Sequence, residues 1–160
     1  MKVLKFLDDY FEMYVCIVLM SSMTLILAVQ VFMRYVMRDS LSWSEELARY
    51  LFVWLIYIGI SYGAKIMKHI KIEAALLLFP ERARSYVELV GDVLFLAFSL
   101  FVVYASWGIV EKQLMLGQTS PAIQMPMWVL YSAPTVGFAL TAFRQVQAIL
   151  HRVSLIRAEG

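Results

Sequence analysis

Apolar residues along this 160-residue chain gather into four long stretches separated by short polar segments. The first three run, without a charge, from Met13 to Met33, from Tyr50 to Ala64 and from Val93 to Val110, and the fourth follows Pro126. A helix needs about 20 residues to cross a bilayer core of about 30 Å, and partly apolar turns extend each stretch. The pattern predicts four transmembrane helices, over residues 10–35, 44–68, 86–114 and 126–151.

The segments around these helices support the same interpretation. The first stretch is longer than the apolar part of a signal peptide, about 7–15 residues, and it ends at Arg34, so we expect an uncleaved helix. Ser42 or Ser44 is expected to cap the second helix. Residues 69–85 mix apolar and charged positions and contain Pro80, which predicts a short interfacial helix followed by a turn. Pro134 is expected to kink the fourth helix.

Composition indicates a single membrane domain over residues 1–160. The chain is 62% hydrophobic and 16% charged, with a mean hydropathy of +0.74, whereas soluble domains are about 45–50% apolar and 25% charged. A net charge of +2 gives no reason to expect nucleic acid as a partner. The single cysteine, Cys16, excludes an intramolecular disulfide. The fold class expected is therefore an all-α integral membrane protein with short interfacial helices.

Lysines and arginines predict the orientation. With the N-terminus inside, ten of them fall on the cytoplasmic side and four on the other, namely Arg34, Arg38, Arg49 and Lys112. Because positive residues concentrate in cytoplasmic segments, both termini are expected in the cytoplasm.

The centres of the four predicted helices hold no ionisable residue. An ion-coupled carrier normally keeps such a residue near the midplane, where it binds the charge. His69 and His151 lie at helix ends, which does not suit paired haem ligands. We therefore expect neither an enzyme nor a cofactor or metal site.

Four charged residues at the outer margin, beside Trp43, form the first candidate site: Arg34, Glu45, Glu46 and Arg49. Arg34 ends the first helix at the depth where Glu45 and Glu46 begin the second, and Glu45 and Arg49 have the i,i+4 spacing of a helix-surface pair. Two interpretations stay open. The charges are either ordinary snorkelling groups at an interface, or a fixed cluster that locks the two helices or receives a partner.

Three further features are candidates for contacts between helices. Asp92 lies about two turns inside the third helix, and an isolated carboxylate there would be costly, so we expect it to pair with Arg144. Glu88 shares the face of Asp92. Gly59 and Gly63 form a G-x-x-x-G spacing, which permits close approach of another helix.

The motifs resemble a known family. They are Arg34-Tyr35, the run from Ser40 to Arg49, His69-Ile70-Lys71-Ile72-Glu73, and Pro126 with Trp128, Tyr131 and Pro134. Together they resemble the small membrane subunit, DctQ-like, of tripartite ATP-independent periplasmic (TRAP) transporters, over nearly the whole chain. Glu73 departs from the pattern, because aspartate is expected there more often.

The resemblance implies a multi-pass protein of a bacterial inner membrane that transports nothing alone. It implies an obligate heterodimer with a large membrane subunit, and a periplasmic substrate-binding protein that delivers a carboxylate of the sialic acid or C4-dicarboxylate type for sodium-coupled uptake. Membrane lipids are the remaining partners. Two alternatives from other classes stay open: a self-sufficient small transporter, and a membrane anchor for a redox or signalling complex.

Overall fold

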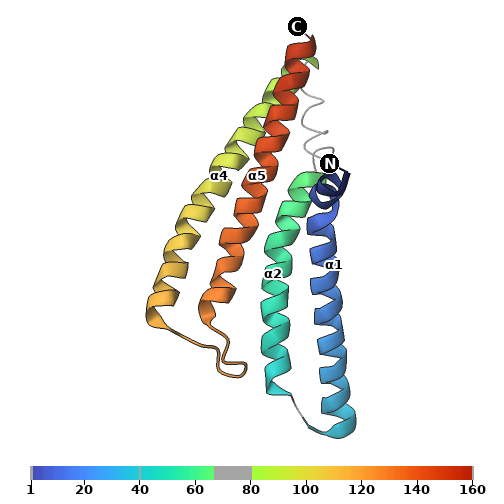
Figure 1. The fold of residues 1–160 in the computed structure, drawn as a ribbon, viewed down its shortest axis with the longest axis vertical. Coiled ribbons are helices and arrows are strands. Elements are labelled where there is room, and N and C mark those ends of the chain that lie inside the picture. Colours follow the sequence, from blue (N-terminus) through green and yellow to red (C-terminus); the bar gives the residue numbers. More distant parts are fainter. Residues whose placement is uncertain (1, 40, 67–80, 160) are drawn as a thin grey trace.

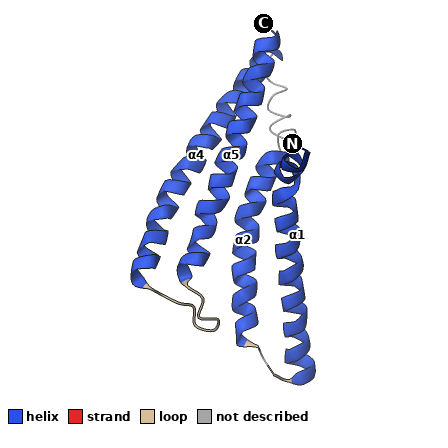
Figure 2. Cartoon of the chain, viewed as in Figure 1, coloured by secondary structure: helices blue, strands red, loops and turns tan. Residues whose placement is uncertain are grey.

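The computed structural model describes residues 2–39, 41–66 and 81–159. It contains the α-helices α1 (Lys2–Phe32), α2 (Ser42–Ile66), α4 (Glu81–Leu116) and α5 (Met127–Glu159), and a short π-helix, η1 (Met33–Met37), continues α1 (Figures 1 and 2). In these ranges β-pairing is limited to one isolated bridge, between Thr119 and Pro126. The all-α prediction is confirmed.

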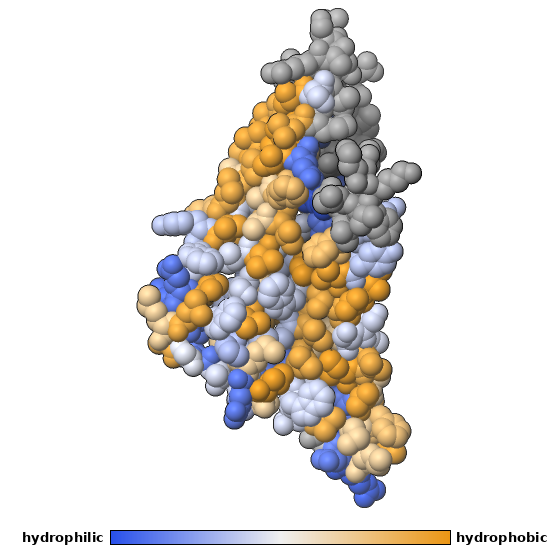
Figure 3. Space-filling model, in the orientation of Figure 1, coloured by the Kyte–Doolittle hydropathy of each residue, from blue (hydrophilic) through white to orange (hydrophobic). Residues whose placement is uncertain are grey.

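The four long helices lie in a row, and they do not close into a bundle (Figure 1). α4 packs on α5, α5 on α2, and α2 on α1, so α4 and α1 form the two edges. Apolar side chains on the edge helices are consequently exposed, with Leu25 at 66% and Leu94 at 65%. Figure 3 shows such side chains over much of one face. In a bilayer this exposure costs little, because lipid tails are as apolar as leucine.

Within the described ranges, three helical segments are long and apolar enough to cross a membrane: Tyr10–Met37, Ser42–Ile66 and Val87–Leu116. The fourth expected span corresponds to α5, which is long enough but is not among these segments. Its C-terminal half carries Arg144, Gln145 and Gln147, which lower its hydropathy. The crossing of α5 therefore remains a prediction.

Helix boundaries differ from the expected ones at two places. α1 begins at Lys2, about eight residues earlier than expected, and α4 begins at Glu81 and not near residue 86. The expected interfacial helix lies mostly outside the described residues, as do His69 and Glu73, and residues 81–85 belong to α4. The start of α1 and the end of α5 lie toward the same end of the molecule, opposite the two loops (Figure 1).

α2 and α5 lie close together at Gly137. A Cβ added there would lie 2.6 Å from both Cβ and the carbonyl oxygen of Tyr57. By contrast, a Cβ added at Gly59 or Gly63 would meet nothing within 4 Å. The expected close contact at the G-x-x-x-G is therefore not made within the described chain. Gly137, in the neighbouring helix, provides it.

Gly137→Ala should therefore destabilise the protein, whereas Gly59→Ala should not. The added methyl at residue 137 forces the backbones of α2 and α5 apart, and overpacking of this kind costs about 1–3 kcal/mol. Thermal unfolding in detergent measures the difference. Equal melting temperatures for the two variants would show that the contact between α2 and α5 accommodates the added methyl group without loss of stability.

Candidate functional site

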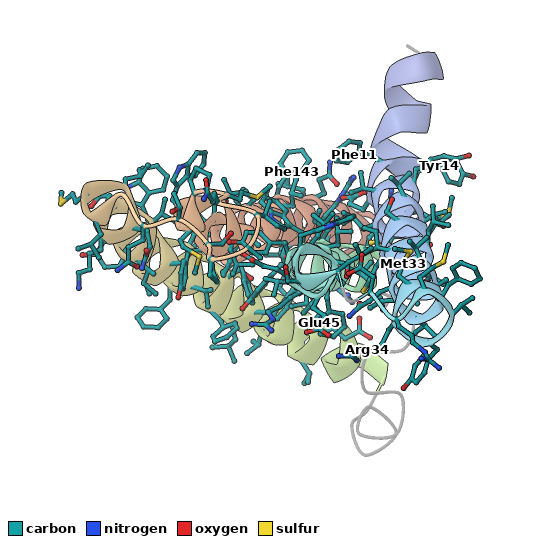
Figure 4. All side chains as sticks on the ribbon, turned by 90° about the horizontal axis from the view of Figure 1, so that it is seen from below. Phe11, Tyr14, Met33, Arg34, Glu45 and Phe143 are labelled. Atoms are coloured by element: carbon teal, nitrogen blue, oxygen red, sulfur yellow. The ribbon has the colours of Figure 1, made fainter. Side chains whose placement is uncertain are left out.

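Glu45, in the first turn of α2, connects α1 to α2 at the loop end. Its Oε1 accepts a hydrogen bond of 2.7 Å from Nε2 of Gln30, and Nη2 of Arg34 lies 3.7 Å away. The end view in Figure 4 shows Arg34 and Glu45 close together on one side of the row. Both charged side chains are more than half exposed, and exposed pairs contribute only about 0–1 kcal/mol. Gln30, which is 6% exposed, therefore makes the more stabilising contact.

Glu46 holds the loop between α4 and α5. Its Oε2 accepts hydrogen bonds from the backbone N–H groups of Ala122, at 2.8 Å, and Ile123, at 3.3 Å. Its Oε1 is buried and has no partner with hydrogen-bond geometry among the described residues, although the Ser120 hydroxyl lies beside the carboxylate. Glu46 thus ties the start of α2 to a segment 76 residues away.

The loop that Glu46 holds is folded by its own hydrogen bonds. Ser120 donates its N–H to the Met125 carbonyl at 2.9 Å, and its hydroxyl oxygen accepts the Met125 N–H at 3.2 Å. Gly117 and Gln124 adopt φ values of 58°, which reverse the chain direction. A compact loop of this kind presents two successive N–H groups to one carboxylate.

Arg49 and Trp43, the other members of the predicted outer cluster, are exposed. Within the described residues, Arg49 forms no ion pair, so the expected pair with Glu45 is not made. The Ser44 hydroxyl donates to the Leu41 carbonyl at 2.7 Å and does not act as an N-cap acceptor.

A pocket of about 260 Å³ opens beside Glu46, which we name the outer pocket. Its walls come from the first turns of α2 and α5 and from the loop before α5. The lining residues are Ser42, Glu45, Glu46, Arg49, Tyr50, Ser120, Pro121, Ala122, Met127 and Leu130.

At the opposite end, a buried ion pair joins α1 to α5. Arg144 donates from Nε to Oε1 of Glu12 at 2.6 Å and from Nη2 to Oε2 at 2.9 Å, and it also donates from Nη1 to Gln147 at 3.0 Å. The two charged side chains are 7% and 1% exposed. A bidentate arginine–carboxylate pair fixes both distance and orientation. It links two helices that are separated by α2 along the row.

Asp92 pairs with a different arginine from the one expected. Nε of Arg152 donates to Oδ2 of Asp92 at 3.1 Å, and Nη1 of Arg152 pairs with Glu88. Asp92 and Arg144, which we expected to pair, thus each bond to another residue, Asp92 to Arg152 and Arg144 to Glu12. The register in which α4 packs against α5 brings Asp92 level with Arg152, about two turns beyond Arg144.

Sequence reasoning missed Glu12 and Gln30 as contact residues. They are the only buried residues within residues 10–39. Their spacing of 18 residues, five turns of 3.6 residues, puts both on one face of α1. The sequence did contain a signal for these contacts, namely two polar residues on one face of a mostly apolar helix. Within the described part of the chain, no three His, Cys, Asp or Glu side chains gather closely enough to hold a metal ion.

The chain is similar to known transporter components. The model of the family described as "Tripartite ATP-independent periplasmic transporters, DctQ component" matches residues 23–155. The isethionate TRAP transporter permease protein DctMQ of Oleidesulfovibrio alaskensis is 28% identical over 98% of this chain, which spans 26% of that protein.

Two shorter relatives come from Vibrio cholerae. The C4-dicarboxylate TRAP transporter small permease protein DctQ is 28% identical over 87% of this chain and 69% of its own length. The sialic acid TRAP transporter small permease protein SiaQ is 26% identical over 98% of this chain and 89% of its own length. The chain therefore belongs to the DctQ component family of tripartite ATP-independent periplasmic transporters and is a multi-pass protein of the inner membrane.

Proposed function

We propose that this chain is a small permease subunit that braces a large membrane subunit during binding-protein-dependent, sodium-coupled uptake of an organic anion. The observation that carries the proposal is the pairing of its buried charges. Glu12 pairs with Arg144, and Asp92 pairs with Arg152. These ion pairs connect helices to one another, as expected for a scaffold. Because the buried charges pair with each other, they do not form a binding site for a transported ion.

The arrangement of the helices supports a bracing role. A row of four helices offers long side faces to a partner, whereas a closed bundle buries its inner faces. Contacts at both ends fix the row: Gln30–Glu45 and Glu46 with the loop at one end, and the two ion pairs at the other. A rigid row of this kind suits a subunit against which a larger partner moves.

The partners and the substrate class follow from the relatives. DctMQ is named a permease and is much longer than this chain, which supports an obligate pair with a large membrane subunit. The other two relatives are named for C4-dicarboxylate and sialic acid, so we infer a carboxylate substrate delivered by a periplasmic binding protein. Both termini then lie in the cytoplasm, and α5 is the fourth span.

Copurification tests the bracing role. The full chain, co-expressed with the tagged large subunit, should be recovered with it at a 1:1 ratio, and the large subunit alone should give lower yield and a lower melting temperature. Recovery of this chain with a haem- or flavin-containing enzyme, and not with a permease, would favour the redox-anchor alternative.

A further inference from the structure

Three apolar side chains at the turn between α1 and α2 are left uncovered by the described part of the chain. Tyr35, Val36 and Met37, which we name the hairpin tip, are 76%, 61% and 61% exposed. They form the end of η1, a helix in which no residue is buried. Arg38 follows with a φ of 56°, and this left-handed conformation ends the helix and turns the chain back toward α2.

The depth of the hairpin tip in the membrane follows from the charges beside it. Arg49 is the last charged residue before the charge-free run of α2, and Glu45 lies about 6 Å nearer the loop end. Arg34 is level with Glu45, because the two form an ion pair, and residues 35–37 continue away from the membrane centre. A headgroup layer is about 5–7 Å thick, so the hairpin tip reaches its water side. In Figure 1 this hairpin also extends beyond the loop between α4 and α5.

Met115 on α4 shows why this depth matters. It is 85% exposed, more than any residue of the hairpin tip. Met127 donates its N–H to the Gln118 carbonyl at 2.9 Å, so Met115, one turn before Gln118, is level with the first turn of α5. That turn carries Trp128, and aromatic residues of this kind mark the membrane interface. Lipid therefore covers Met115, whereas the hairpin tip lies further from the lipid tails.

We propose that the hairpin tip is a contact surface for the large membrane subunit, which covers it with an apolar recess and places a carboxylate opposite Arg38. This inference rests on the bracing role proposed above and names a surface through which this chain holds its partner. Arg38 is exposed and forms no ion pair with Asp39 or with any other described residue. It is therefore available to an acidic group of the partner.

A permanent partner fits the composition of the hairpin tip better than a transient one. Interfaces of obligate complexes are more apolar than those of complexes that assemble and dissociate. A soluble binding protein would leave Tyr35, Val36 and Met37 facing water whenever it dissociates, and exposed apolar patches favour aggregation. Lipid headgroups would surround the same side chains without satisfying them. Figure 3 shows hydrophobic and hydrophilic side chains next to one another at this end of the molecule, as a recess with a charged edge requires.

Copurification of variants tests the contact. The full chain is co-expressed with its tagged large subunit, and the ratio of the two is measured after purification. We expect the triple variant Tyr35→Ser, Val36→Ser, Met37→Ser to be recovered at a ratio several-fold lower than the unmodified chain. Arg38→Glu should also lower the ratio, and Arg38→Lys should keep most of it. Met115→Ser is the matched control, because it removes an equally exposed apolar side chain, and it should leave the ratio unchanged.

Folding and crosslinking are measured alongside. Because no residue of η1 is buried, the triple variant alone in detergent should melt at the same temperature as the unmodified chain. A photoreactive phenylalanine analogue at residue 36 should crosslink the otherwise unmodified chain to the large subunit in membranes that lack the binding protein. The same analogue at residue 115 should not.

The outcomes separate this inference from the role on which it rests. Equal recovery of the triple variant and the unmodified chain would overturn the contact surface and leave the bracing role standing. A crosslink from residue 36 to the binding protein alone, or to lipid alone, would do the same. Failure of the unmodified chain to copurify with the large subunit would overturn both proposals.

Discussion

Glu12→Gln and Arg144→Gln should each lower the stability of the protein by about 3–5 kcal/mol, the typical cost of leaving one partner of a buried ion pair uncompensated. These are the largest effects that we expect. Both side chains are almost fully buried, and the pair joins α1 to α5. The double variant removes both charges together and should recover much of the loss.

The double-mutant cycle of these variants is read by thermal unfolding of the complex in detergent. Asp92→Asn serves as a matched control, because Asp92 bonds to Arg152 and not to Glu12. Its effect should add to that of Glu12→Gln. Strict additivity between Glu12→Gln and Arg144→Gln would mean that the two side chains do not interact.

Glu46→Ala should free the loop between α4 and α5 from α2. The carboxylate accepts the N–H groups of Ala122 and Ile123, and alanine leaves both donors to solvent. Hydrogen–deuterium exchange of a peptide over residues 118–125 should become faster, with little change in peptides from the start of α1 and the end of α5. We also expect uptake to fall, because a loop that Glu46 no longer holds does not keep one conformation at the surface.

Glu111→Ala is the control for this second prediction. Glu111 lies on the same side of the molecule but accepts its hydrogen bond from Trp107 within α4. Its loss should leave exchange in residues 118–125 unchanged. Equal exchange in the Glu46 and Glu111 variants would show that the loop holds its conformation through the Ser120 bonds alone.

The sequence predicted the helices well because, in a chain this hydrophobic, long charge-free stretches are explained by helices that lie in a membrane. It also placed Arg34 near Glu45, since the end of one helix and the start of the next must lie at the same depth. The contact of Asp92 with Arg152 was not predicted, because the register of α4 against α5 decides which arginine comes level with Asp92, and the sequence does not show that register.

Other contacts could not be read from the sequence. The spacing of Gly59 and Gly63 shows that small residues share one face of α2, but it does not show which helix packs there. Gly137 makes the close contact instead. A helix face that contacts lipid and one that contacts protein are both apolar. The sequence therefore does not show which helices lie side by side in the row. The bonds of Glu46 depend on a loop conformation that includes Gln124 at a φ of 58°, which no periodicity predicts.

Sodium-driven uptake in liposomes tests the bracing role most directly. Four preparations are compared: this chain alone, the large subunit alone, the two together, and the two together without the binding protein. The account predicts uptake of the carboxylate substrate only when both membrane subunits and the external binding protein are present with an inward sodium gradient. Uptake by the large subunit and the binding protein at full rate without this chain, or uptake by this chain alone, would contradict it.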